Sequence, residues 1–200
     1  MIKAAEIIDH SIELALKESW ESFSLVELAS ELDCSLNDIR HYFRSKDDIA
    51  EAIFDRADAA MLALPQEETY QQLSENEKLI TAIMCWFEFL APIKPLVKEI
   101  MAYKFEPGHF HLQAHGITRV SRTVQWFMTV AQRNSRGVTR LTDEVAVTSA
   151  YLSCFAFFLI DQSPNDHNTR AMLSRLIKQI DHGQHLLARL LPSRKRRPGV

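Results

Sequence analysis

The chain has 200 residues, a net charge of −3 and 46% hydrophobic residues, so it is long enough to bury a sizeable core. Apolar residues recur at helical spacing, alternating strand patterns are almost absent and only five residues are glycine, which predicts an all-α protein. Three widely spaced cysteines are typical of reduced thiols in a cytoplasmic protein, and because the chain opens on a helical pattern we expect no signal peptide. The most apolar stretch, 145–160, is shorter than the roughly 20 residues of a bilayer span, so we expect no membrane span.

Short helices are predicted near the N-terminus. Residues 2–19 carry an apolar stripe opposite a charged face, typical of a surface helix. Three capping-box patterns follow, each a serine with a carboxylate three positions later: Ser24 with Glu27, Ser35 with Asp38, and Ser45 with Asp48. They predict helices at 25–32, 36–43 and 46–64. Short helices joined by tight turns are the form of a helix-turn-helix, whose second helix enters the major groove of DNA.

A larger helical body is predicted after a polar linker. Pro65 and the run 66–74 form the best linker in the chain, and a fourth capping box pairs Ser74 with Glu77. Pro92 and Pro95 separate that helix from the next, and longer helices are expected at 110–134, 143–160 and 166–190. We therefore divide the chain into a head at 1–46, a linking helix at 47–64, a body at 75–191 and a basic flexible tail at 192–200.

Residues 23–58 resemble the DNA-binding head of the TetR family of bacterial transcriptional regulators. The resemblance is carried by Leu28-Ala29, Ser35, Ile39 and the run Phe43-Arg-Ser-Lys46-Asp-Asp-Ile49. It implies a three-helix head, a linking helix and a larger antiparallel helical body for ligand binding and dimerisation. It also implies a repressor that binds operator DNA. The chain departs from the family pattern at Leu36, Asn37 and Arg40, where the family usually has a polar or basic residue, glycine and tyrosine.

The predicted second helix of the helix-turn-helix presents polar side chains outward. Asparagine can read adenine and arginine can read guanine, each through two hydrogen bonds, whereas hydroxyl and ammonium groups suit the phosphate backbone. The candidate DNA-contacting residues are Ser35, Asn37, Arg40, His41, Tyr42, Arg44 and Lys46.

The charge of the head conflicts with this interpretation. Residues 1–60 contain six basic and fourteen acidic residues, a net charge of −8, whereas binding to phosphate depends on lysine and arginine. A second, looser resemblance points elsewhere. The stretch 155–180, with Asp161-Gln-Ser163 before a helix start at Thr169-Arg170, and Trp126-Phe-Met128 resemble the coenzyme-Q biosynthesis accessory family. That family has a TetR-like fold and binds lipid instead of DNA. A lipid- or quinone-binding accessory protein therefore stays open as the alternative function.

Large apolar side chains crowd the predicted body. Most of them are explained equally well by core packing, but aromatic residues on several helices are also typical of an apolar ligand pocket. The resemblance implies a pocket for an apolar small-molecule or lipid effector. Its candidate residues are Trp86, Phe89, Met101, Tyr103, Trp126, Phe127, Phe155 and Phe158.

Two further expectations concern assembly and chemistry. The helix at 143–160 is apolar nearly all round and the helix at 166–190 carries a leucine and isoleucine stripe, so we expect a homodimer through these helices. His109, His111 and His115 cluster, but polar residues at a helix start explain them, and we expect no metal. No glycine-rich phosphate loop or strand-turn-helix nucleophile frame occurs in the sequence, so we expect no enzyme and no cofactor.

Overall fold

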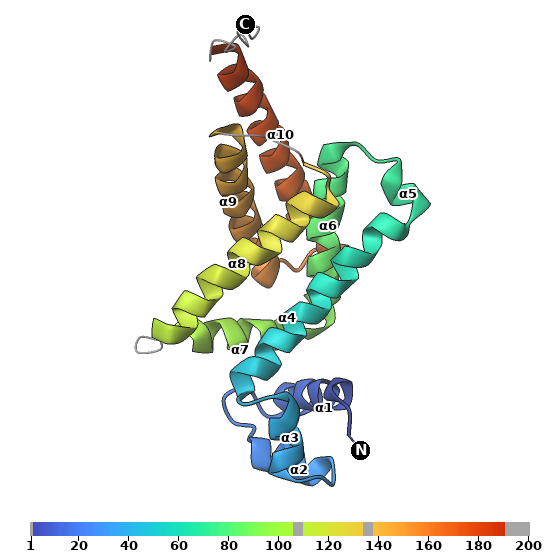
Figure 1. Cartoon of the computed structure of the whole chain (residues 1–200), viewed down its shortest axis with the longest axis vertical. Helices are drawn as coiled ribbons and strands as arrows, with labels where there is room; N and C mark the ends of the chain where they lie inside the picture. Colours follow the sequence, from blue (N-terminus) through green and yellow to red (C-terminus); the bar gives the residue numbers. More distant parts are fainter. Residues whose placement is uncertain (1, 106–109, 134–137, 191–200) are drawn as a thin grey trace, which may run out of the picture.

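The computed structural model describes residues 2–105, 110–133 and 138–190. Within these ranges it is all-α, as the sequence predicts, with a small head at one end of an elongated molecule (Figure 1). The head consists of α1 (Ala4–Lys17), α2 (Leu25–Glu31) and α3 (Leu36–Tyr42). Helix α4 (Lys46–Ala63) begins in the head and runs diagonally into the body, so it connects the two parts.

The predicted capping residues begin the short helices of the head. The hydroxyl oxygen of Ser24 accepts from the backbone N–H of Glu27 at 3.2 Å, and Ser35 and Ser45 do the same for Asp38 and Asp48. Because these bonds satisfy donors that the first turn leaves free, they fix where each helix starts.

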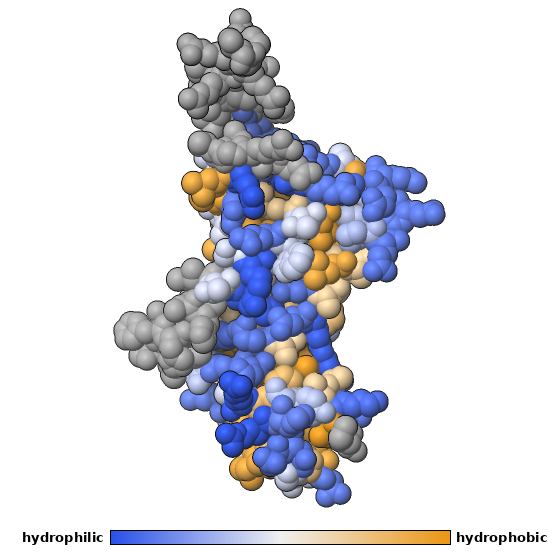
Figure 2. Space-filling view, viewed as in Figure 1, coloured by the Kyte–Doolittle hydropathy of each residue, from blue (hydrophilic) through white to orange (hydrophobic). Residues whose placement is uncertain are grey.

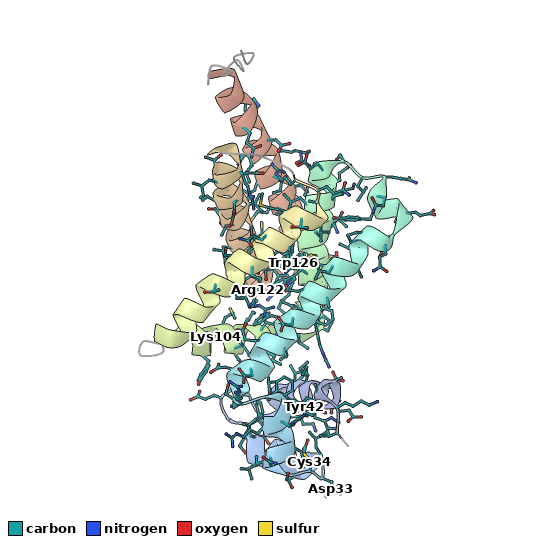
Figure 3. All side chains as sticks on the ribbon, viewed as in Figure 1. Asp33, Cys34, Tyr42, Lys104, Arg122 and Trp126 are labelled. Carbon is teal, nitrogen blue, oxygen red and sulfur yellow. The ribbon has the colours of Figure 1, made fainter. Side chains whose placement is uncertain are left out.

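The turn between α2 and α3 depends on one residue with left-handed backbone geometry. Asp33, at the lower end of the head in Figure 3, has φ = 46°. The following N–H, of Cys34, donates to the carbonyl of Ala29 at 3.0 Å, and the N–H of Asp33 donates to Ser30. This is a Schellman ending, in which glycine usually occupies the position that Asp33 has here.

The body contains six further α-helices and three short 3₁₀ turns within the described ranges. Their bounds are η1 Leu64–Gln66, α5 Glu68–Gln71, α6 Glu75–Leu90, η2 Ala91–Ile93, α7 Lys94–Phe105, α8 Phe110–Val130, α9 Val138–Ile160, η3 Pro164–Asp166 and α10 His167–Leu190. Helix α4 packs along α6 and α8, and α9 packs against α10 and α8.

The structure differs from the sequence-based expectation in two places. The expected linker contains the one-turn helix α5, and its Tyr70 is buried with the hydroxyl donating to the carbonyl of Lys78 at 3.1 Å. The linker therefore packs on the body, because the ring of Tyr70 is buried there. Helix α9 also begins at Val138, five residues before the expected start.

Buried polar contacts join the C-terminal helices. The guanidinium of Arg133, after α8, donates to Asp143 at 2.8 Å, to Asn76 at 2.9 Å and to Asp181 at 2.9 Å. These partners lie on α9, α6 and α10, so one side chain fixes four segments relative to one another. Burial lowers the pKa of Arg133, but its hydrogen bonds to the carboxylates of Asp143 and Asp181, and their negative charges, outweigh this effect and raise the pKa overall.

Two segments, Glu75–Lys104 and Arg140–Ile160, are long and apolar enough for a membrane span by composition alone. Both form part of the packed helical body, where they contribute buried residues such as Phe87 and Cys154. The face shown in Figure 2 is largely hydrophilic over α8 and α5. Core packing accounts for part of the apolar composition of these helices, and the second also exposes apolar side chains such as Leu141 and Val145.

Candidate functional site

The exposed face of α3 is the first candidate site. Ile39 is buried and faces the head core, so the helical period turns Asn37, Arg40 and His41 to the solvent, followed by Arg44 after the helix. The outward placement matches the sequence analysis. Contact of these side chains with DNA stays a prediction.

Two other predicted DNA-contacting residues hold internal bonds. The Ser35 hydroxyl donates to the Asp38 carboxylate at 2.6 Å, and the Tyr42 hydroxyl donates to the carbonyl of Ile2 at 3.1 Å. The hydrogen bonds from Ser35 lower the pKa of Asp38. Figure 3 shows Tyr42 close to the start of the chain, where its hydrogen bond joins the N-terminal segment to α3.

Lys46 is placed differently from the phosphate contact expected for it. Its ammonium donates to the backbone carbonyls of Trp20 at 2.6 Å, Phe23 at 2.8 Å and Glu21 at 3.2 Å. It also lies 4.3 Å from the centre of the Phe23 ring. An ammonium has three N–H groups, and the three carbonyls account for them. Lys46 therefore organises the loop between α1 and α2 and has no free donor for phosphate.

Part of the negative charge of residues 1–60 belongs to the body. On α4, the carboxylates of Glu51, Asp55 and Asp58 all accept from the Arg119 guanidinium of α8, at 3.0, 2.6 and 3.0 Å. Lys104 of α7 forms a second ion pair with Glu51. Counting charge by sequence thus overstates the negative charge near α3, because cations distant in sequence pair with these carboxylates and offset most of their charge.

A cavity of about 580 Å³ is the second candidate site, and it lies between α4, α6, α7, α8 and α9. Three of the eight residues predicted for a pocket line it: Trp86, Met101 and Phe155. The sequence analysis missed Phe54 and Tyr151, which also line it. Phe54 was assigned to the linking helix, and no local pattern indicates that α4 forms a cavity wall.

The other five predicted pocket residues do not line the cavity. Phe127 and Phe158 are buried in the core, with Phe158 stacked on Phe87 at a ring distance of 5.0 Å. Tyr103 is half-buried. Phe89 and Trp126 are 39% and 42% exposed, and Figure 3 shows Trp126 on the outer side of α8. Composition indicates aromatic richness, but helix rotation decides which ring faces the cavity.

A buried polar cluster joins this cavity to α4. Asp58 accepts from the indole N–H of Trp86 at 2.8 Å, from Arg119 and from the Thr123 hydroxyl at 3.2 Å. Burial raises the pKa of Asp58, and the charge of Arg119 opposes that rise. Burial also tends to raise the pKa of Glu51. The hydrogen bond and charge of Lys104 and the charge of Arg119 nevertheless hold that pKa below its ordinary value. Trp86, Arg119 and Thr123 line the cavity, so groups that an occupant would touch are bonded directly to α4.

Helix α9 exposes apolar side chains, and two of them, Leu141 and Val145, also line the mouth of the cavity. Leu141, Val145 and Ile160 of α9 are 65%, 59% and 67% exposed. A separate groove between the end of α9 and α10 is lined by Phe157, Asn168, Ala171, Met172, Arg175, Leu176 and Gln179. An exposed apolar face of this kind is typical of a protein–protein interface.

The residues behind the looser second resemblance have a local structural role. The Asp161 carboxylate accepts from the N–H of Ser163 at 2.9 Å and from the N–H and hydroxyl of Thr169 at 2.9 and 2.7 Å. Burial would raise the pKa of Asp161, but these bonds lower it well below the usual range. They fix the turn into α10, which explains the pattern without a ligand.

The histidine cluster of the sequence falls mainly where the structure describes no side chains. His109 lies outside the described residues, as does the tail 192–200, and the side chains of His111 and His115 are not described. Among the described residues, no group of three or more His, Cys, Asp or Glu side chains is placed to hold a metal ion.

Comparison with known proteins gives a strong structural relative. No family model and no curated protein matches the sequence. Among solved structures, the crystal structure of the TetR transcriptional regulator from Nitrosomonas europaea ATCC 19718 is similar with a TM-score of 0.79 and 36% sequence identity. The match covers 89% of this chain and 97% of that chain, so head and body are both included.

Proposed function

The chain belongs to the TetR family of transcriptional regulators, and from that premise we propose that it is a cytoplasmic repressor controlled by an apolar ligand. The observation that carries the proposal is the polar outer face of α3, where Asn37, Arg40 and His41 are exposed beside Arg44. These side chains can read base edges in the major groove. The proposal includes no catalytic step and no cofactor.

We propose that two copies bind one operator. The apolar outer face of α9 and the groove beside α10 would be covered by the same face of a second copy, which gives a two-fold dimer. Each α3 would then read one half-site, about 34 Å from the other on the same side of the duplex. Light scattering at micromolar concentration should give twice the mass of one chain, and a monomer would contradict the dimer.

The ligand would act through α4. An occupant of the cavity would contact Trp86 and Arg119, whose polar groups bond to Asp58 of α4. It would favour one position of α4 over another and so change the spacing of the two heads on DNA. Head and ligand would thus communicate without direct contact.

Selection from random duplex DNA tests the proposal. The full-length protein should enrich a palindrome, and a variant in which Asn37 and Arg40 are both alanine should not enrich it. Both side chains are exposed on α3, so the variant should keep its fold, which circular dichroism checks. Failure of the wild-type protein to enrich any palindrome at low salt, where attraction to phosphate is strongest, would contradict DNA reading.

The acidic head favours one alternative, a lipid- or quinone-binding accessory protein that no longer binds DNA. It predicts no DNA affinity at low ionic strength and a lipid or quinone that co-purifies with the protein. A denaturing extract without apolar small molecules, together with palindrome enrichment, would exclude this alternative.

A further inference from the structure

The cations that line the cavity are already used by carboxylates. Lys104 pairs with Glu51, and Arg119 donates to Glu51, Asp55 and Asp58. An anionic ligand would have to compete with these carboxylates, all fixed on α4, for each positive charge. The cavity is therefore poorly suited to a ligand with a carboxylate or phosphate group.

One lining carboxylate stands apart. Glu144, on α9, is half-buried and lines the cavity, but it forms no ion pair with any residue that the structure describes. Its carboxylate accepts a long hydrogen bond from the side-chain amide of Gln125, at 3.5 Å. The other described charged residues of the lining, Glu51, Lys104 and Arg119, all form ion pairs. Glu144 can therefore pair with a positive charge that a ligand brings.

Neighbouring hydroxyl groups also favour a ligand that needs no hydrogen-bond donor from the protein. The hydroxyl of Thr148 donates to the carbonyl of Glu144 at 2.7 Å, and that of Ser149 donates to the carbonyl of Val145 at 2.9 Å. Since their protons are used within α9, these side chains offer the cavity oxygen lone pairs only.

Aromatic rings form much of the remaining wall. Trp86 stacks on Phe54 at a centroid distance of 5.9 Å and meets the edges of Tyr151 and Phe155, both at 5.6 Å. Ring faces attract cations as well as apolar groups, and the attraction increases when the cation is removed from water. The wall thus accepts an apolar body that carries a positive charge.

We propose that this cavity binds a lipophilic monocation, with its positive group beside Glu144 and its apolar part against Phe54, Trp86 and Phe155. The inference rests on the proposed function only for the regulatory meaning of binding. The ligand class itself follows from the charges and rings of the cavity.

Three single-chain probes of nearly equal chain length test the proposal: decyltrimethylammonium, 1-decanol and decanoate. Each is titrated calorimetrically into the full-length protein below the concentration at which micelles form. We expect the cation to bind at least about tenfold more tightly than decanoate, with decanol between them, because their head groups carry a positive, a negative and no charge respectively. Glu144→Gln should weaken binding of the cation about tenfold and leave the affinity for decanol unchanged.

Glu88→Gln is the matched control, since Glu88 is an exposed carboxylate of α6 that pairs with Arg170 and does not line the cavity. It should leave all three affinities unchanged. Equal binding of the three probes, tighter binding of decanoate, no binding of the cation, or no effect of Glu144→Gln would each overturn the ligand class. Palindrome enrichment is measured without any probe, so a protein that selects DNA but does not prefer the cation overturns this inference alone.

Discussion

The head and the body each contain a cation that links distant segments, but the partners differ. In the head, Lys46 donates to three neutral carbonyls of one loop. In the body, Arg119 donates to three carboxylates of α4, a helix that continues into the head. The first contact lies within the head and makes it rigid. The second joins head and body, so it has to change if α4 moves relative to α8.

The largest expected effect is on the body. Arg119→Leu leaves Asp58 buried without its cation, and breaking a buried pair in this way should lower the free energy of unfolding by about 3–5 kcal/mol. Urea denaturation measures the change. The control is Arg170→Leu, whose exposed pair with Glu88 should contribute less than about 1 kcal/mol. Similar losses in the two variants would show that the α4 cluster does not hold the body together.

The next effect separates stability from DNA binding in the head. Lys46→Met removes the bonds to the loop carbonyls, and we expect a loss of about 2 kcal/mol in stability. The slope of operator affinity against salt should stay the same, because Lys46 holds no phosphate. Arg44→Ala should have the opposite effects. Stability should change little, and the slope of log operator affinity against log salt concentration should become shallower by about one. A shallower salt dependence of operator affinity for Lys46→Met would show that Lys46 does contact phosphate.

A smaller effect tests base reading. Arg40→Ala should weaken the selected operator by about 1–3 kcal/mol if Arg40 pairs with a base, and specificity at that position should relax. Fluorescence anisotropy on operators changed one base pair at a time measures both. Arg170→Ala, outside the head, serves as the control. An equal loss of affinity for every DNA sequence would indicate that Arg40 contacts the phosphate backbone of the DNA and not a base.

The smallest effect concerns the turn between α2 and α3. Asp33→Gly relieves the left-handed conformation at φ = 46° and should stabilise the protein by about 0.5–1 kcal/mol. Asp33→Asn removes the same charge but keeps a side chain that tolerates this geometry. If Asp33→Asn stabilises the protein as much as Asp33→Gly does, the negative charge of Asp33, and not its backbone geometry, is what lowers stability at this turn.

Local sequence signals predicted the head well. Each capping serine is three residues from its carboxylate, so Ser24, Ser35 and Ser45 could be assigned from the sequence alone. The role of Lys46 could not, because its partners at Trp20 and Phe23 are set by how the loop folds back.

Less of the cavity could be predicted, because it depends on long-range packing. Trp86 and Phe155 were expected there, whereas Trp126 and Phe89 carry the same apolar signal and are exposed. Periodicity gives the faces of one helix, but the rotation of each helix against four others decides what surrounds a cavity. The contacts of Arg119 with α4 span more than 60 residues and leave no local pattern.

Operator affinity with and without a bound cavity probe tests most directly whether head and body form one switch. The full-length protein is titrated with its selected duplex in the absence of decyltrimethylammonium and at a saturating concentration of it. We expect the probe to weaken operator binding by about 1–3 kcal/mol, and the operator to weaken probe binding by the same factor, because the coupling is reciprocal. Equal operator affinities in the two titrations, with the cavity occupied, would contradict communication through α4.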